Sequence, residues 1–440
     1  MEAPQNSSKG NPQGSRDTTA CPSGHHTSQL PVGLSSTSPE VFCRRTKCPA
    51  ATLPGPALRV PLSDPAFAAR FATPPAASSD NMPGDVTLAG VAEPMFGNET
   101  EFVRWLRARV PERDPRLKLG IGDDAALVGL PQGHELILTT DLSLEDVHFT
   151  TALHPPRSVG HRALARSLSD VAAMGGTPRY ALVSLALTRG TPRAWVEGFY
   201  KGLLALARTF KVSVIGGDTA VVPGPCMIDV IVAGEIPRRQ ALRRAGARPG
   251  DLLYVSGRLG LSALGLRLLR AARGGQDTGP VARQMRPKSE APSELPDAAP
   301  ASAREAIQAH LYPQPQCALG RYLAARRLAT AMIDLSDGFS TDLRRLCEAS
   351  GVGARVRAEH LPQPDLKDPG DSLQLALHGG EDYQLLFTVD PRRALRLTGR
   401  FRGVPLRLIG EITRARRIIL HHLTGHEETL RPGGFDHFRE

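Results

Sequence analysis

Carboxylates next to glycine or hydroxyl residues recur along this 440-residue chain, and such groups can bind metal ions and phosphates. Glycine lets a backbone approach a phosphate closely and offers its N–H as a donor. Mg²⁺ prefers oxygen ligands and usually bridges one or two carboxylates to substrate phosphates. Six segments have this pattern: Gly120–Ala126 (GIGDDAA), Thr139–Asp141 (TTD), Ser169–Gly175 (SDVAAMG), Gly216–Thr219 (GGDT), Ile333–Gly338 (IDLSDG) and His378–Tyr383 (HGGEDY). Together they indicate Mg²⁺–ATP binding and phosphoryl transfer to a small phosphorylated acceptor.

Each of these segments also has an ordinary structural explanation. An Asp beside a Gly is more often a turn residue than a ligand. Asp170 could be a structural carboxylate on a helix, and Gly216-Gly217 could be a plain turn after a strand. Several carboxylates in one pocket repel one another, however, and therefore favour a bound cation. Six such segments in one chain favour a shared metal site over six unrelated turns.

The common phosphate-binding and catalytic motifs do not occur in the sequence. It contains neither GxxxxGK[ST] nor a Rossmann GxGxxG, no protein-kinase motif set and no HExxH. A Ser or Cys nucleophile with a paired base is not evident either. The phosphate-binding site is therefore expected to consist of metal ions held by aspartates from several segments.

Alternating strands and helices must position these segments, and we predict two α/β halves, an N-terminal domain at 95–236 and a C-terminal domain at 237–440. In the first half we predict helices at 99–106, 158–174 and 192–210, and strands at 136–140, 181–187, 212–215 and 226–233. In the second half we predict helices at 261–270, 317–328 and up to about 350, and strands at 250–257, 354–356, 385–389, 406–411 and 418–421. A site built between the two halves would draw on acidic segments from both.

Two stretches are rich in Pro, Ser and Ala and show no apolar period. Residues 1–94 cannot bury enough apolar surface to offset their ordering entropy, so we expect a disordered extension. Alternatively, translation begins near Met82 or Met95. Residues 271–305 are expected to form a flexible surface insertion.

Bulk composition restricts the class of protein further. The formal net charge of +10 is compatible with a nucleic-acid-binding protein, but the arginine-rich stretches carry no interleaved ladder of aromatic residues, and an anionic small-molecule partner explains a basic protein equally well. No apolar run is long enough to span a bilayer, and the first residues lack the apolar stretch of a secretory signal. The six cysteines form no CxxC pair, which favours a reducing cytoplasm over a disulfide framework or a zinc site.

Seven segments of the sequence resemble motifs of the thiamine-monophosphate kinase family, and they follow one another in the same order and at the same spacing as in that family. They are GIGDDAALV, TTDLSLEDVHF, SLSDVAAMGGTPRY, IGGDTA, IDLSDGFSTDL, HGGEDYQLLFTV and the terminal GGFDHF. The family belongs to a superfamily with aminoimidazole ribonucleotide synthetase and selenophosphate synthetase. The latter is disfavoured because residues 112–118 contain no reactive Cys. The resemblance covers about 101–438, and none of the extension.

The resemblance implies roles for individual residues. Asp141, Asp218 and Asp337 would be catalytic, and His148, Glu381 and Phe435 would hold thiamine monophosphate. Phe435 departs mildly from the family, which commonly has Tyr or Trp there. Glu381 would face the cationic thiazolium. Gly217, Asp218, Arg244 and Ser336 would contact ATP. The Mg²⁺ shell would comprise Asp124, Thr139, Thr140, Asp141, Asp170, Asp218, Asp334 and Asp337.

The resemblance also implies the reaction and the architecture. We expect direct in-line transfer of the γ-phosphoryl group of ATP to thiamine monophosphate, the last step of thiamine diphosphate biosynthesis. The fold would be α/β (α+β) with two domains, as in aminoimidazole ribonucleotide synthetase. Its N-terminal mixed sheet would form a barrel in a cytoplasmic homodimer that binds neither nucleic acid nor membrane. Two alternatives remain: a superfamily enzyme with another acceptor, and a basic nucleic-acid-binding protein.

Overall fold

The structure, a computed structural model, describes residues 96, 99–110, 114–121, 126–273, 300–435 and 437. The predicted extension at 1–94, Asp124, and residues 274–299 of the predicted insertion lie outside this part. The described elements are, in chain order, α2 (Glu99–Arg107), β1 (Leu117–Leu119), β2 (Leu127–Val128), β3 (His134–Leu144), α3 (Pro156–Ala173), β4 (Thr177–Thr188), α4 (Arg193–Phe210), β5 (Ser213–Val222), β6 (Met227–Pro237), β7 (Leu252–Ser256), α5 (Leu261–Ala272), α7 (Ala301–Leu311), α8 (Cys317–Ala325), β8 (Ala329–Leu335), α9 (Phe339–Ser350), β9 (Gly353–Arg357), η1 (Ala358–His360), α10 (Pro369–His378), β10 (Gln384–Val389), α11 (Pro391–Ala394), β11 (Arg400–Phe401), β12 (Val404–Thr413), β13 (Ile418–His421) and β14 (Glu427–Thr429).

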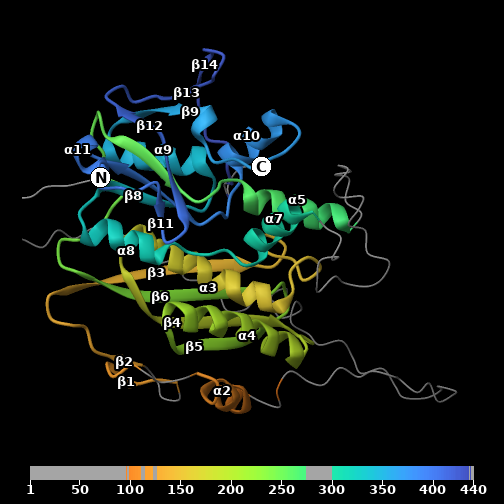
Figure 1. The fold of residues 1–440 in the computed structure, drawn as a ribbon. Helices are drawn as coiled ribbons and strands as arrows, with labels where there is room; N and C mark the ends of the chain where they lie inside the picture. The colour runs from red at the N-terminus through yellow and green to blue at the C-terminus, as the bar shows by residue number, and fades with distance from the viewer. Residues whose placement is uncertain are drawn as a thin grey trace, which may run out of the picture. The chain divides into compact units, whose positions relative to one another are not determined.

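The first half of the described chain contains a four-stranded sheet in the order β3-β6-β4-β5. β6 pairs antiparallel with β3 and β4, whereas β5 runs parallel to β4. A parallel pair needs a crossover connection, and α4 provides it between β4 and β5. α3 and α4 lie side by side against one face of this sheet (Figure 1). Buried and more exposed residues alternate along β6 because only that face is covered by helices.

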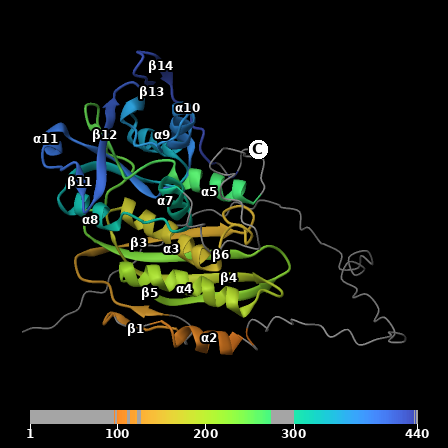
Figure 2. The same ribbon diagram turned by 45° about the vertical axis from the view of Figure 1, so that its right-hand side comes forward.

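The second half contains a mixed sheet in the order β14-β13-β9-β12-β7-β10-β8, with the short β11 paired to β12. The neighbouring strands β7 and β10, and β8 at one edge of the sheet, are nearly continuous apolar runs, as expected of strands covered on both faces. α9 packs on β8 and β9, α10 packs on α9, and α5 pairs with α7. Figure 2 shows these helices around the second sheet.

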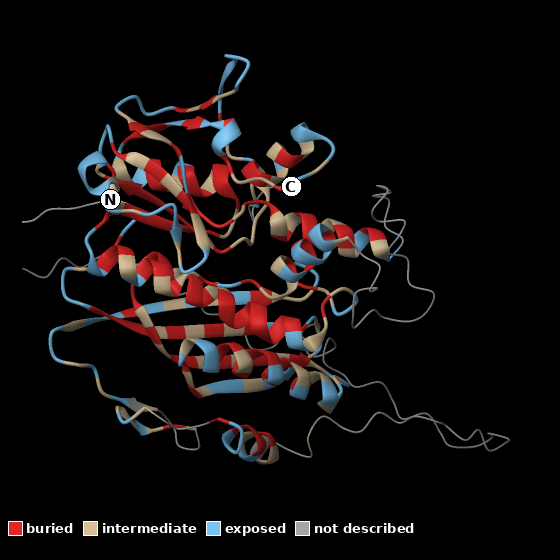
Figure 3. Ribbon diagram, viewed as in Figure 1, coloured by how far each residue is buried: buried red, intermediate tan, exposed pale blue. Residues whose placement is uncertain are grey.

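α3 is shared by the two halves. It contacts β3, β4 and β6 of the first sheet and also α7, α8, β8 and β10 of the second half. Fourteen of its 18 residues are buried, and Figure 3 shows this burial along most of the helix. A helix that is surrounded by protein can carry small and apolar residues on all sides, and α3 has four alanines and two leucines. Its polar side chains, among them Arg162, Ser169 and Asp170, are held between both halves.

The fold class is confirmed, and three details differ from the expectation. β5 continues through Gly216-Gly217 instead of turning there, because a Cβ at Gly217 would lie 1.9 Å from the carbonyl oxygen of Val183 on β4 and only glycine allows this approach. Both ends of the predicted insertion at 271–305 are helical, since α5 extends to Ala272 and α7 begins at Ala301. α10 was not predicted. No helix within the described ranges is long and apolar enough to cross a membrane.

Candidate functional site

Three aspartates from separate elements form an acidic cluster (Asp141, Asp170 and Asp334) beside α3. Asp141 of β3 faces α3 because alternate residues of a strand point to opposite faces of the sheet. Asp170 lies in the last turn of α3, and Asp334 lies near the end of β8. The hydroxyl of Thr139 donates to Oδ2 of Asp170, and Oγ of Ser169 donates to Oδ2 of Asp334 at 2.8 Å. The structure therefore brings four predicted metal-binding residues together from both halves.

The carboxylates of the acidic cluster repel one another. Burial and the charge of Asp170 raise the pKa of Asp141 to about 6, against the opposing charge of Arg166. Burial, again with the charge of Asp170, raises the pKa of Asp334 well above its usual range. Oδ2 of Asp141 is buried and accepts no hydrogen bond within the described part of the chain. Buried carboxylates without partners are costly unless a cation neutralises them.

This set of donors fits Mg²⁺, which prefers carboxylate and hydroxyl oxygens. Among the described residues, no three His, Cys, Asp or Glu side chains are arranged to hold a metal ion by themselves. Mg²⁺ seldom needs such a cage, because it retains waters and binds substrate phosphates alongside one or two carboxylates. The acidic cluster therefore fits a cation whose remaining ligands come from a nucleotide.

The loop that follows β8 carries the predicted residues Ser336 and Asp337. Asp342 in the first turn of α9 accepts hydrogen bonds from the backbone N–H groups of Ser336, Asp337 and Gly338, at 3.1, 3.1 and 3.2 Å. Arg345 donates to the carboxylates of both Asp337 and Asp342. Asp337 thus accepts a hydrogen bond from an arginine, whereas the described residues offer no such bond to the carboxylates of the acidic cluster.

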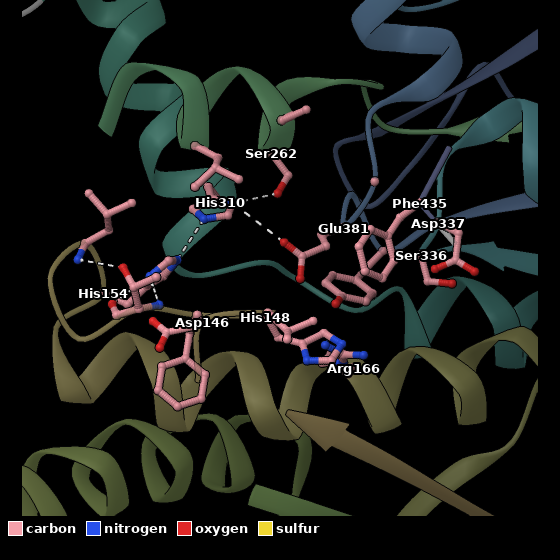
Figure 4. Close-up of a pocket in the computed structure, with 18 of the residues that line it drawn as sticks. Asp146, His148, His154, Arg166, Ser262, His310, Ser336, Asp337, Glu381 and Phe435 are labelled. Atoms are coloured by element: carbon pink, nitrogen blue, oxygen red, sulfur yellow. Dashed lines mark hydrogen bonds and ion pairs between the residues drawn. The ribbon is translucent and has the colours of Figure 1, made fainter. Parts of the chain in front are cut away.

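A cavity of about 330 Å³ opens next to this loop (Figure 4). It is lined by all three predicted substrate residues, His148, Glu381 and Phe435, and by Ser336 and Asp337. Arg166 of α3 also lines it, and its Nε lies 3.8 Å from Oδ1 of Asp141. The cavity therefore borders the acidic cluster, and we call it the substrate pocket.

Glu381 of the substrate pocket is not a free anion. Both of its carboxylate oxygens accept hydrogen bonds from Nη2 of Arg162, at 2.7 and 2.8 Å. Burial raises the pKa of Glu381, but the charge and hydrogen bonds of Arg162 together with the charges of His310 and Arg166 outweigh burial, and the pKa falls to about 2. Arg162 also donates to the carbonyl oxygens of His310 and His148, at 2.6 and 3.1 Å. Glu381 is ionised, and much of its charge is balanced by an arginine that joins three segments of the pocket wall.

His148 presents a neutral imidazole to the pocket. The backbone N–H of Leu144 donates to its Nδ1 at 3.0 Å, which leaves the proton on Nε2. Burial, together with the charge of Arg166, lowers the pKa of His148 to about 4. Nε2 is buried and has no hydrogen-bond partner within the described part of the chain. It is therefore a donor available to a bound molecule.

Phe435 reaches the pocket on the C-terminal segment. Its N–H donates to the carbonyl oxygen of Asp337 at 2.9 Å. A Cβ at the preceding Gly434 would lie 2.0 Å from that oxygen, so this close contact requires glycine. The ring is 46% exposed and meets His148 edge-to-face with 6.3 Å between the ring centroids. An exposed aromatic face at a pocket suits a flat heterocyclic ligand.

Gly217 and Asp218 are not brought to the acidic cluster within this chain. β3 and β5 are the two edge strands of the first sheet, so Asp218 lies three strands away from Asp141, roughly 14 Å. The side chain of Asp218 is exposed, and its Oδ1 accepts a hydrogen bond from the N–H of Thr219. The close packing of Gly217 on Val183 is a structural reason for that glycine. Their predicted roles remain predictions.

Thr140 and Arg244 also lie differently from the cluster residues. Thr140 points to the sheet face opposite α3, where its hydroxyl donates to Oδ1 of Asp229 at 2.6 Å. Arg244 is exposed in the connection between β6 and β7, but its charge opposes the raised pKa of Asp170. Arg244 is therefore near enough to the acidic cluster for its charge to act on Asp170. Asp124 lies outside the described residues.

Sequence reasoning missed Arg162 and Arg166, which line or support the pocket from α3. The spacing of Arg162, Arg166 and Asp170 by four residues contains the signal, because such residues share one face of a helix. A predicted helix with an acidic residue at its end, and two arginines on the same face, indicates an anion site. Glu381, the partner of Arg162, lies 219 residues further along the chain and could not be found by spacing.

Comparisons with known proteins show which families and structures this chain resembles. Family profiles described as AIR synthase related protein, N-terminal domain and C-terminal domain, match residues 122–236 and 248–422. A thiamine-monophosphate kinase of Salmonella typhimurium is 36% identical over 328 residues, 73% of this chain and 92% of that protein. The crystal structure of thiamine-monophosphate kinase from Stenotrophomonas maltophilia is 35% identical with a TM-score of 0.61, over 72% of this chain and 94% of that one. A complex of AaThiL with AMPPCP and TMP is 30% identical with a TM-score of 0.57, over 77% of this chain and 97% of that one.

Proposed function

This chain belongs to the thiamine-monophosphate kinase family, and we propose that it transfers the γ-phosphoryl group of ATP to thiamine monophosphate, giving thiamine diphosphate and ADP. The observation that carries the proposal is the substrate pocket, lined by His148, Glu381 and Phe435 and bordered by the acidic cluster. A related protein binds AMPPCP and TMP together, which supports an ATP-dependent reaction on that acceptor.

We propose Mg²⁺ as the metal, held by Asp141, Asp170 and Asp334, with Asp337 at the edge of the pocket. When bound, Mg²⁺ would neutralise the negative charge that develops on the transferring phosphoryl group. Asp124, Thr139, Thr140 and Asp218 remain proposed members of the wider metal shell. The raised pKa of Asp141 and its unpaired oxygen support this assignment.

The residues of the chain itself mainly position the reactants. The acceptor oxygen belongs to a phosphate that is already ionised, so no strong general base is needed to create the nucleophile. The ring of Phe435 and the neutral His148 would hold the thiamine heterocycles. Glu381 would attract the cationic thiazolium with the part of its negative charge that Arg162 does not balance. Arg244, Ser336 and Gly217 are proposed to contact ATP. Positioning of two bound phosphates in line then supplies most of the rate enhancement.

We propose that two copies of the chain pair through the open face of the first sheet. This face exposes Leu136, Leu138, Leu142 and Met227, with 51%, 64%, 43% and 40% of each residue exposed. An apolar sheet face of this kind usually marks an interface. A monomeric wild-type chain in a sedimentation experiment, or an L138E variant that still dimerises, would contradict the pairing.

We also propose a cytoplasmic location, because buried Cys226, Cys317 and Cys347 are unpaired thiols that suit a reducing compartment. The proposed domains remain 95–236, carrying most of the metal ligands, and 237–440, carrying Asp334, Asp337 and the pocket loops. The division agrees with the limits of the two family profiles.

The decisive experiment incubates the purified chain with ATP, Mg²⁺ and thiamine monophosphate and quantifies thiamine diphosphate by chromatography. We expect stoichiometric formation of thiamine diphosphate and ADP. Parallel reactions with selenide and with an aminoimidazole precursor test the alternative acceptors, and salt-dependent binding to DNA or RNA tests the remaining alternative. ATP consumption with another acceptor and not with thiamine monophosphate would refute the proposal. A covalently phosphorylated chain during turnover would refute direct transfer.

A further inference from the structure

Arg166 is a largely buried arginine whose donors are unused in the described part of the chain. Its side chain is 16% exposed, and that exposed surface faces the substrate pocket that it lines. Its nearest carboxylate oxygen, Oδ1 of Asp141, is 3.8 Å from Nε, which is too long for a hydrogen bond. No described residue accepts a hydrogen bond from its guanidinium. A guanidinium has five N–H donors, so several remain for a ligand.

The other arginines of the site are either occupied or distant. Arg162 uses its donors on Glu381 and on two backbone carbonyl oxygens. Arg345 is paired with Asp337 and Asp342. Arg270 also lines the pocket, but at the end formed by α5 and α7, where its charge acts on His154 and His310. Arg166 is thus the arginine of the described pocket that combines unused donors with proximity to the acidic cluster.

We propose that Arg166 binds the phosphate of thiamine monophosphate in the substrate pocket, an inference that rests on the proposed function. Figure 4 shows Arg166 beside His148 on the pocket side of α3. The acceptor phosphate must lie next to the acidic cluster to receive a phosphoryl group there, and Arg166 is at that boundary. Its planar fork can donate to two phosphate oxygens at once, and its charge reduces the repulsion between two phosphates.

The test compares the affinities for thiamine monophosphate and for unphosphorylated thiamine, measured by calorimetry without ATP. The two ligands differ by the phosphate alone, so the ratio of their affinities reports phosphate recognition. In R166M we expect the affinity for thiamine monophosphate to fall roughly 10- to 100-fold while the affinity for thiamine is unchanged. R166K keeps the positive charge but lacks the planar set of guanidinium donors. Its ratio of affinities should therefore lie between those of R166M and the wild type. R344M removes an exposed arginine of α9 outside the pocket, and as the control it should keep the full ratio.

Two results would overturn the inference. R166M could keep the wild-type ratio, or it could lose affinity for both ligands equally, as expected of a residue that only maintains the pocket. If R166M does not fold, R166K decides: an undiminished ratio in R166K contradicts recognition by the guanidinium fork. A wild-type chain that forms thiamine diphosphate while R166M keeps the ratio refutes this inference alone. A wild-type chain that forms no thiamine diphosphate refutes the proposed function and this inference together.

Discussion

Arg166 lies near two sets of carboxylates, the acidic cluster and Glu381. They differ in how their negative charge is balanced. Asp141 and its neighbours in the acidic cluster are buried and repel one another, and Oδ2 of Asp141 has no hydrogen-bond partner among the described residues. Glu381, by contrast, accepts two hydrogen bonds from Arg162, which is itself bound to two carbonyl oxygens. Both groups lie at the junction of the two halves. Burial alone therefore does not distinguish a carboxylate that needs a bound cation from one whose charge is balanced within the protein.

The difference is in what neutralises the charge. An internal ion pair whose hydrogen bonds are complete holds segments of the chain together. Removing one partner leaves a buried charge that has lost its counter-ion and is poorly solvated. A carboxylate whose pKa is raised by its neighbours is instead destabilising until a cation binds. Substitutions in the two groups should accordingly change activity and stability in different directions.

The largest effect is expected for D141N, which removes one charge from the acidic cluster. Formation of thiamine diphosphate should fall roughly 1000-fold or more, because metal-dependent charge neutralisation is lost. The free energy of unfolding should stay the same or rise, since repulsion with Asp170 is relieved. Steady-state assays and urea unfolding measure the two quantities. E348Q, in an exposed pair on α9, is the control; activity retained in D141N would contradict the metal assignment.

The second prediction concerns the paired carboxylate. R162M leaves Glu381 without its partner and should lower the free energy of unfolding by about 3 kcal/mol, as for other buried pairs that lose one member. Arg162 is 5% exposed and Glu381 25% exposed, so solvent can compensate only in part. Urea unfolding of R162M and of the double variant R162M/E381M measures the coupling. Equal stability of wild type and R162M would remove the contrast between the two groups.

Much of the fold could be predicted from the sequence, since apolar periodicity and motif order indicate two α/β halves. The acidic cluster was also predictable, because Asp141, Asp170 and Asp334 each belong to a recognisable motif. The pairing of Arg162 with Glu381 was not, since it depends on how α3 packs against a loop far along the chain. The course of β5 through Gly216-Gly217 was ambiguous for a similar reason: only the approach of Val183 distinguishes strand from turn.

A third, smaller effect is a pH dependence of opposite sign for the two groups. The folded-state pKa of Glu381 is depressed to about 2, so its stabilisation is present above its ordinary pKa of 4.5 and is lost as the pH falls toward 2. The folded-state pKa of Asp141 is raised to about 6, so its contribution is complete below its ordinary 3.8 and is lost as the pH rises through 6.

Urea unfolding in EDTA, from pH 3 to 8, would measure both dependences. The stability difference between wild type and E381Q should shrink by about 2 kcal/mol toward acid. The difference between wild type and D141N should change by a similar amount, but in favour of D141N as the pH rises. If the stability differences from wild type change with pH in the same direction for E381Q and D141N, the two carboxylates have similar surroundings. That result would contradict the difference inferred from their contacts.

The smallest expected effect is stabilisation by Mg²⁺ itself. A cation that binds the folded acidic cluster stabilises the wild type by about 1 kcal/mol at a concentration a few times its dissociation constant. D141N should gain less, whereas E381Q should gain as much as wild type because its substitution lies outside the cluster. Thermal unfolding with MgCl₂, against NaCl at equal ionic strength, separates binding from general screening. Equal stabilisation of wild type and D141N would place the cation elsewhere, and loss of stabilisation in E381Q would show that the two groups act as one site.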